Sequence, residues 1–177
     1  MICIGQAPGP TSITSSSLPP LPLTGLAGSR LAKLAGMTEN DLWSRCDRLN
    51  IFQYYPGVKN ISNVKKKNAK YKKHQSVGDQ FNLHQAREIA DTIDITCYHL
   101  VVLLGLNVAK AFRIQKPTLF ARYYINSELN VIQLKDGESH DTMDATLILI
   151  FPHPSGVSHF WNSRRNRNRA MNELRLA

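Results

Sequence analysis

Unbroken apolar runs predict the strands around which the chain folds. The longest are LILIF at 147–151 and LVVLL at 100–104, and a shorter run, ICI, stands at 2–4. Apolar runs of this kind, bounded by Gly or Pro, are typical of strands buried on both faces of a parallel sheet. A further strand is predicted over 51–55, and strand with turn is expected within 120–132.

Segments with helical spacing alternate with these strands. They are predicted at 26–35, ended by Gly36, at 39–46 after a capping Thr38, at 83–93, at 107–112, and from 163 through Leu174. Alternation of strands and helices predicts an α/β fold, a three-layer α/β/α sandwich with a central, mostly parallel sheet. No repeat or linker divides the pattern, so residues 1–177 are expected to form a single domain.

Composition agrees with a folded domain and indicates an acidic partner. The 177 residues are 42% hydrophobic and 20% charged, which is typical of a globular protein, and the formal net charge is +9. A strongly basic chain favours a polyanion such as DNA, while a soluble basic protein or a ribosome-associated one is the alternative. The most basic segment, 59–73, contains seven lysines, among them Lys65, Lys66 and Lys67, and is interpreted as a loop that contacts phosphates without reading sequence.

Cysteines and histidines give no support for a metal or cofactor. Cys3, Cys46 and Cys97 form neither a CxxC pair nor a disulfide framework, and the six histidines lack the spacing of a zinc site. We therefore expect no metal and no cofactor. Since no secretory signal and no apolar run of about 20 residues occurs, the expected location is the cytoplasm, with no membrane association and a monomeric state.

Two loops next to predicted strands carry candidate chemistry. His153 directly follows the strand at 147–151, and the carboxyl ends of strands are where open α/β sheets bind ligands. Ser155 and Gly156 offer small groups and backbone N–H donors that suit a phosphate. Gln6 is the polar side chain of the loop after the first strand. A plain strand and turn is the alternative for 147–156, and a loop residue that satisfies local backbone is the alternative for Gln6.

The chain resembles the uracil-DNA glycosylase superfamily. GQAPG at 5–9 and HPSGV at 153–157 resemble its two signature motifs. Between them, PLTGLAGSRL at 22–31 and VVLLGLNVAKA at 101–111 are similar to segments of the thermophile-type branches. The ordered set spans nearly the whole chain. It implies the same three-layer fold and an enzyme that flips a nucleotide out of DNA and hydrolyses its N-glycosidic bond.

The resemblance also assigns roles to individual residues. His153 would stabilise the departing base near its O2, and Gln6 would orient the base or the attacking water. Val157 matches the position of an apolar wedge, and Ser155, Gly156 and Ser158 would hold phosphates. Arg164 and Arg165 would attract DNA at longer range, with a solvated helix surface as the alternative. The base pocket is expected to comprise Ala7, Pro8, Gly9, Leu23, Tyr54 and Tyr55.

The chain departs from the family in its acids and in its pocket wall. The acidic residues that the branches use are replaced here by Gln6, Ala7 and Leu26, and the four cluster cysteines of the thermophile type are missing, so no iron–sulfur cluster is expected. Asp79 is the candidate replacement acid, with a helix cap or turn residue as the alternative. An amide can hold a water in line, but it cannot take the proton from that water.

The pocket wall has Gly9 and Pro10 where the uracil-specific branch has a bulky tyrosine, and the Tyr54–Tyr55 region stands in place of the pyrimidine-reading asparagine. A roomier cavity favours a pyrimidine with a 5-substituent, such as the modified bases of phage DNA, and hence a role in defence. The alternatives are a uracil-excising repair enzyme and a non-catalytic DNA-binding module on the same fold. A nucleotide-binding enzyme of another α/β family would need a phosphate loop, and neither GxxxxGK[ST] nor GxGxxG occurs.

Overall fold

A six-stranded sheet forms the centre of the protein. The computed structural model describes residues 1–8, 21–55, 81–125, 131–134, 145–154 and 159–176. The strands lie in the order β2-β1-β3-β6-β4-β5. The first four in this order pair in parallel, and β4 and β5 are antiparallel. Their bounds are β1 Ile2–Gly5, β2 Asp47–Asn50, β3 Leu100–Leu104, β4 Arg122–Ile125, β5 Val131–Gln133 and β6 Thr146–Phe151.

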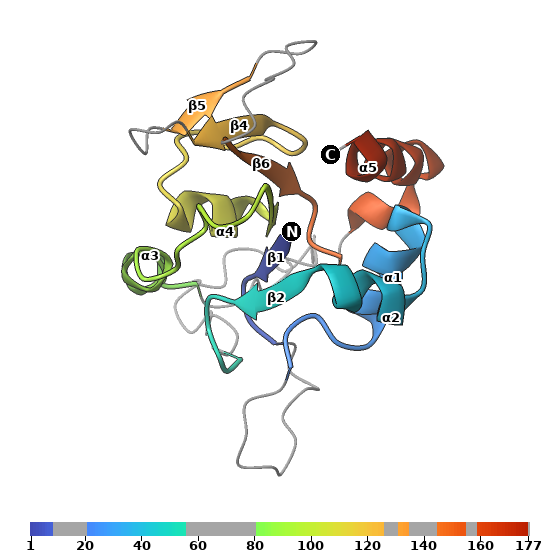
Figure 1. The fold of residues 1–177 in the computed structure, drawn as a ribbon, viewed down its shortest axis with the longest axis horizontal. Helices are drawn as coiled ribbons and strands as arrows, with labels where there is room; N and C mark the ends of the chain where they lie inside the picture. The colour runs from blue at the N-terminus through green and yellow to red at the C-terminus, as the bar shows by residue number, and fades with distance from the viewer. Residues whose placement is uncertain (9–20, 56–80, 126–130, 135–144, 155–158, 177) are drawn as a thin grey trace, which may run out of the picture.

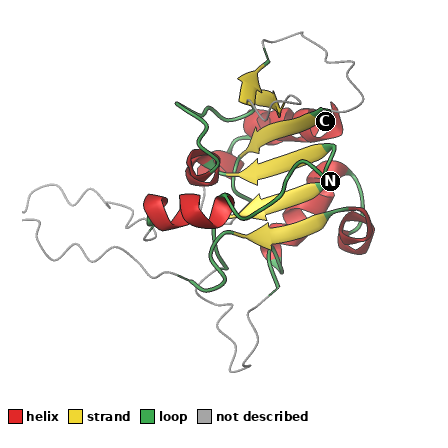
Figure 2. Ribbon diagram, turned by 60° about the vertical axis from the view of Figure 1, so that its left-hand side comes forward, coloured by secondary structure: helices red, strands yellow, loops and turns green. Residues whose placement is uncertain are grey.

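Helices cover both faces of this sheet (Figures 1 and 2). One face carries α3 (Leu83–Ala90) and α4 (Leu106–Ala111). The other carries α1 (Leu26–Ala35), α2 (Glu39–Arg45), the 3-10 helix η2 (His159–Asn162) and α5 (Arg164–Leu176). The predicted three-layer sandwich with a mostly parallel sheet is confirmed. Within the described ranges, no helix has the length and apolar sequence that crossing a membrane requires.

The apolar runs are explained by burial on both faces. In β3, Val101 and Leu103 point into the core under α3 and α4, which we call the first core. Val102 and Leu104 point into the second core, under α1, α2 and α5. Because both sides of the strand are covered, no polar position is needed, and the sequence shows no alternation.

The strand predicted at 51–55 is wrong. β2 occupies Asp47–Asn50, and residues 51–54 form bends after it. β2 is an edge strand, paired only with β1, so it tolerates the exposed Asp47 and lacks the apolar run that marks a central strand. The apolar and aromatic residues at 51–55 instead line a cavity.

Local signals set most helix boundaries. Thr38 caps α2 by accepting the Asp41 N–H at 3.2 Å, and Gly36 ends α1 at a φ of 76°, as predicted. Cys46 follows α2 and does not belong to it. α3 ends at Ala90, three residues before the predicted Ile93.

The strand order places a topological switch point at the carboxyl edge of the sheet. The chain leaves β1 towards α1 and α2 on one face, and it leaves β3 towards α4 on the other face. Adjacent parallel strands whose connections diverge in this way open a crevice between their carboxyl ends, which is where ligands bind in α/β sheets.

Candidate functional site

The two motif loops end at the same edge of the sheet. β1 and β6 both pair in parallel with β3, with Ile4 opposite Leu103 and Leu104 opposite Phe151. Gln6 and His153 therefore leave the sheet on either side of the residues that follow β3. Two strand spacings, about 10 Å, separate the backbones of β1 and β6. The N-terminal and C-terminal motifs therefore meet at one edge of the sheet.

The Gln6 side chain contacts α4. The Asn107 Nδ2 group donates to Gln6 Oε1 at 3.4 Å, a long hydrogen bond. Asn107 lies in the first turn of α4, directly after β3. An amide oxygen has two acceptor positions, so this contact uses one of them and leaves the other, together with the NH₂ group, to offer to a ligand. The loop backbone is held by the Phe52 N–H, which donates to the Gln6 carbonyl at 2.9 Å.

Asn50 is a candidate site residue that the sequence reading missed. It ends β2, it is 7% exposed, and its Oδ1 has no hydrogen-bond partner among the described residues. The β2 register places it beside Gly5. A Cβ on Gly5 would lie 2.5 Å from Asn50 Oδ1 and 3.2 Å from Leu23 Cδ2, so glycine is required for this close approach.

An unpaired buried carbonyl oxygen costs about 1–3 kcal/mol. Asn50 Oδ1 lies against Gly5, so a ligand N–H group would reach this acceptor only after the side-chain amide turns away from Gly5. The expectation that the Tyr54–Tyr55 region takes the place of the asparagine depended on the misplaced strand. With β2 ending at residue 50, an asparagine does stand at the end of the second strand. The sequence does contain this asparagine, directly after Leu49. It can be recognised as the end of the second strand only when the bounds of β2 are correct.

His153 belongs to a loop whose backbone is clamped on two sides. Trp161 Nε1 of η2 donates to the His153 carbonyl at 2.8 Å, and Arg30 of α1 donates to the Pro154 carbonyl at 2.6 Å. The Arg30 guanidinium also lies over the Trp161 ring, 5.5 Å from its centroid. One cation and one indole from two different elements therefore fix the backbone that carries the imidazole.

Gly105 brings β3 close to the same loop. Its N–H donates to the Phe151 carbonyl at 2.8 Å, and its φ of 104° is accessible mainly to glycine. A Cβ at this position would lie 3.8 Å from the Cβ of His153. His153 thus stands directly beside the β3–α4 junction, the junction that also supplies Asn107.

The expected base-pocket residues divide into three places. Ala7 and Pro8 continue the loop after Gln6, and Pro8 is buried. Leu23 is 7% exposed and packs in the second core against Gly5. Tyr54 and Tyr55 lie beyond β2, where they line a cavity together with residues of α3.

Several predicted residues lie outside the described residues. They are Asp79, Gly9, Lys65, Lys66, Lys67, Ser155, Gly156, Val157 and Ser158. Their roles stay predictions.

Arg164 and Arg165 are exposed in the first turn of α5. The N-terminus of a helix carries a partial positive charge, which is unfavourable next to the two arginine side chains. The first turn of α5 contains no acidic residue that would offset these positive charges. An approaching phosphate would relieve this repulsion. Arg167 and Arg169 have internal partners instead, the Trp161 carbonyl at 2.6 Å and the Phe120 ring at 4.6 Å.

Other titratable groups serve the fold. The pKa of Tyr98 is raised to about 12 because its hydroxyl donates to Asp47 at the amino end of β2, 2.8 Å away. The pKa of the Cys3 thiol is raised well above its usual value by the Cys46 thiol at 3.5 Å and by burial, so Cys3 stays neutral. Among the described residues, no group of three or more His, Cys, Asp or Glu side chains could hold a metal ion.

The edge therefore assembles an amide donor at Gln6, a buried acceptor at Asn50 and an imidazole at His153. These groups can hold a flat polar ring by its edges and stabilise negative charge that develops on it. A family model described as Uracil DNA glycosylase superfamily matches residues 1–175. A search of curated proteins finds no match for the chain.

Proposed function

The chain belongs to the uracil DNA glycosylase superfamily, and we propose that it is a monofunctional DNA glycosylase that flips a pyrimidine nucleotide and leaves an abasic site. Membership of this superfamily suggests DNA glycosylase activity. The observation that carries the proposal for this chain is the convergence of Gln6, Asn50 and His153 on one edge of the sheet.

Asn50 is the group that reads the base. Its unpartnered Oδ1 is an acceptor, and pyrimidines present an N–H donor on the pairing edge, N3–H in uracil and thymine or N4–H₂ in cytosine. A flipped base that donates to Asn50, with the amide turned from Gly5 towards the base, satisfies an oxygen that otherwise stays buried and unpaired. The same hydrogen bond stabilises the flipped base and so offsets part of the stacking and pairing energy that the base loses on leaving the duplex.

His153 is the group that stabilises the leaving base. Breaking the glycosidic bond leaves the sugar with oxocarbenium character and the base as an anion. The clamp from Arg30 and Trp161 fixes the His153 backbone before substrate arrives, so little reorganisation accompanies the development of charge.

Gln6 acts as a donor that orients the base or the water. Asn107 engages one side of its Oε1, so the NH₂ group is available to donate to the ligand. An amide cannot take up the proton of the attacking water. No carboxylate is present among Gln6, Asn50, Asn107 and His153. The carboxylate that accepts the proton from water would therefore be that of Asp79. Without Asp79 the reaction is slower. The lack of a carboxylate among Gln6, Asn50, Asn107 and His153 is the observation that favours the second candidate function, a non-catalytic DNA-binding module.

The substrate we favour is a pyrimidine with a 5-substituent, as in modified phage DNA, in a cytoplasmic, monomeric enzyme of antiviral defence. The support comes from the sequence, which has Gly9 and Pro10 where a bulky aromatic residue excludes 5-substituents from the uracil-specific branch. A uracil-excising repair enzyme is the alternative within the same chemistry.

Three oligonucleotides that carry uracil, 5-hydroxymethylcytosine or a bulkier 5-substituted cytosine test the proposal. Released bases are identified by mass spectrometry, and abasic sites are detected as alkali-induced strand breaks. Release of the substituted bases supports the defence enzyme, and release of uracil alone supports repair. Binding without release from any DNA favours the non-catalytic module.

A further inference from the structure

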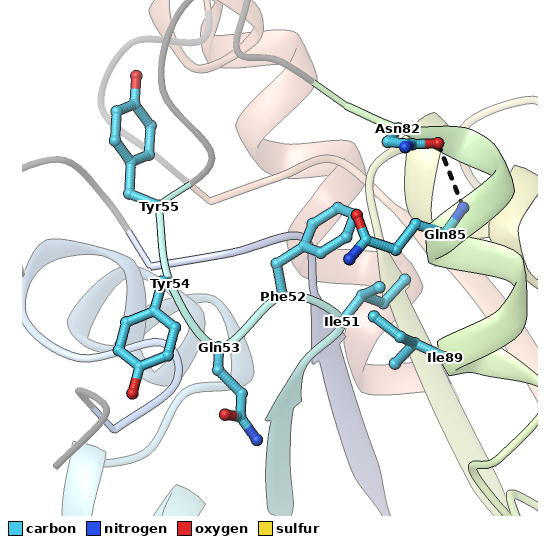
Figure 3. Close-up of a pocket in the computed structure, with 8 residues that line it drawn as sticks. All are labelled: Ile51, Phe52, Gln53, Tyr54, Tyr55, Asn82, Gln85 and Ile89. Carbon is cyan, nitrogen blue, oxygen red and sulfur yellow. Dashed lines mark hydrogen bonds between the residues drawn. The ribbon is translucent and has the colours of Figure 1, made fainter.

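A cavity separate from Gln6, Asn50 and His153 lies between residues 51–55 and α3. Its volume is about 610 Å³, within the range of roughly 300–1,000 Å³ that small-molecule sites occupy. Its lining comprises Ile51, Phe52, Gln53, Tyr54, Tyr55, Asn82, Gln85 and Ile89 (Figure 3).

The cavity and Asn50 lie on opposite sides of the sheet. Ile51 packs in the first core with α3, whereas Asn50 approaches Gly5 and Leu23, which borders the second core. The cavity is nonetheless connected to the catalytic loop, since its Phe52 donates its N–H to the Gln6 carbonyl at 2.9 Å. Phe52 therefore belongs both to the cavity wall and to the backbone contact that holds the Gln6 loop.

The lining has the chemistry that binds nucleobases. It combines aromatic rings, side-chain amides and two isoleucines, and none of these lining residues is charged. In Figure 3 the Phe52 ring and the Gln85 side chain point toward one another, with Ile51 and Ile89 beside them, while Tyr54 and Tyr55 point away from this group. The Phe52 ring is held by the edge of Phe81, with ring centroids 5.6 Å apart. Aromatic rings stack on base faces, and a glutamine amide pairs with a base edge, adenine above all.

We propose that this cavity is a second nucleobase subsite, which binds an unpaired base of the same strand that carries the target nucleotide. The proposal rests on the proposed function in that it takes DNA as the ligand. An unpaired neighbour is available in single-stranded DNA and not in an intact duplex. The subsite therefore makes single-stranded or locally unpaired DNA the preferred substrate.

The test uses single-stranded oligonucleotides in which one base at a time, on either side of the target, is replaced by an abasic analogue. Loss of the base that occupies the subsite should weaken binding about tenfold, the order expected for one stacked base, as measured by fluorescence anisotropy. Restoring that position with each of the four bases should give the tightest binding for adenine.

Gln85→Ala removes the base-reading amide from an exposed position on α3 and should abolish the dependence on that base. Gln115→Ala, at an exposed glutamine that does not line the cavity, is the matched control and should retain the dependence. Nuclear magnetic resonance gives a second readout, since deoxyadenosine alone should shift the side-chain amide signal of Gln85.

The outcomes separate this subsite from the glycosylase activity. If bases are released but no flanking base and no Gln85 substitution alters affinity, the subsite is overturned while the proposed function stands. If the flanking base and Gln85 both matter although no base is released from any DNA, the subsite stands and the catalytic proposal fails. Failure to bind DNA at all overturns both.

Discussion

The two loops that bound the candidate site are held to different degrees. The His153 loop is clamped through two consecutive carbonyls, by Trp161 at 2.8 Å and by Arg30 at 2.6 Å. Within the described part of the chain, the Gln6 loop is held by the backbone bond from Phe52, and the Gln6 side chain is held by one long bond of 3.4 Å from Asn107. The His153 loop, which carries the charge-stabilising group, is therefore fixed before substrate binds. The Gln6 loop carries an amide side chain that can still rotate.

This difference matches the two tasks. Stabilising developing charge requires groups that are already in place, because reorganisation in the transition state cancels their benefit. Orienting a base or a water requires a donor that adapts to the ligand. The comparison therefore predicts that changes in the His153 loop lower the rate of base release more than changes around Gln6 lower it.

His153→Ala should have the largest effect. Removal of a group that stabilises the leaving base should lower the single-turnover rate of base release at least about 100-fold. Affinity for DNA should be nearly unchanged, because the basic segments remain. Rates from alkali cleavage and affinities from anisotropy measure the two quantities, and an unchanged rate would remove His153 from the mechanism.

Asn50→Leu separates base reading from stability. Loss of the acceptor for the pyrimidine N–H group should reduce base release about 30-fold, within the roughly 1–3 kcal/mol that a specific base contact contributes. The free energy of unfolding should stay level or rise, because a buried unpaired oxygen is removed. Thermal unfolding monitors stability, and a large loss of stability would mean that Asn50 is structural.

Sequence alone predicted the layers and the central strands, because unbroken apolar runs identify strands buried on both faces. It misplaced β2, since an edge strand such as Asp47–Asn50 carries no apolar run. Asn50 was missed for that reason. The clamp could not be predicted, because Arg30 and Pro154 are 124 positions apart and only the packing of α1 against the loop brings them together.

Gln6→Glu tests whether a carboxylate is the only group that the Gln6 loop lacks for faster catalysis. A carboxylate can accept the Asn107 N–H and also take a proton from water, so base release should increase about tenfold. The increase requires the deprotonated form. The rate of the variant should therefore rise as pH rises through the pKa of the new carboxyl, and this rise should be larger than any rise that Asp79 gives the wild-type rate in the same range. A pH–rate series for both proteins measures this difference, and Gln6→Ala should not gain activity.

Arg30→Ala tests the clamp itself. Loss of the bond to the Pro154 carbonyl frees the backbone next to His153 and should lower the maximal rate roughly fivefold, equivalent to about 1 kcal/mol, with affinity for DNA unchanged. Arg30→Lys retains a donor and should recover part of the rate. Arg113→Ala, which removes an exposed ion pair with Asp91, is the control and should leave the rate unchanged. A fall in affinity without a fall in maximal rate would contradict a positioning role.

Asn107→Ala should have the smallest effect on the rate of base release. It measures how much the Gln6 loop depends on a fixed side-chain position. The bond that it removes is 3.4 Å long and lies at an exposed position, so the loss in rate should be about twofold. Because Asn107 engages the Gln6 acceptor, its loss should also let the Gln6 amide turn either way, which weakens discrimination between bases more than it weakens the rate. Relative rates on uracil and 5-substituted cytosine DNA measure this. If Asn107→Ala is as damaging as Arg30→Ala, both loops are equally preorganised, and the division of tasks between them is wrong.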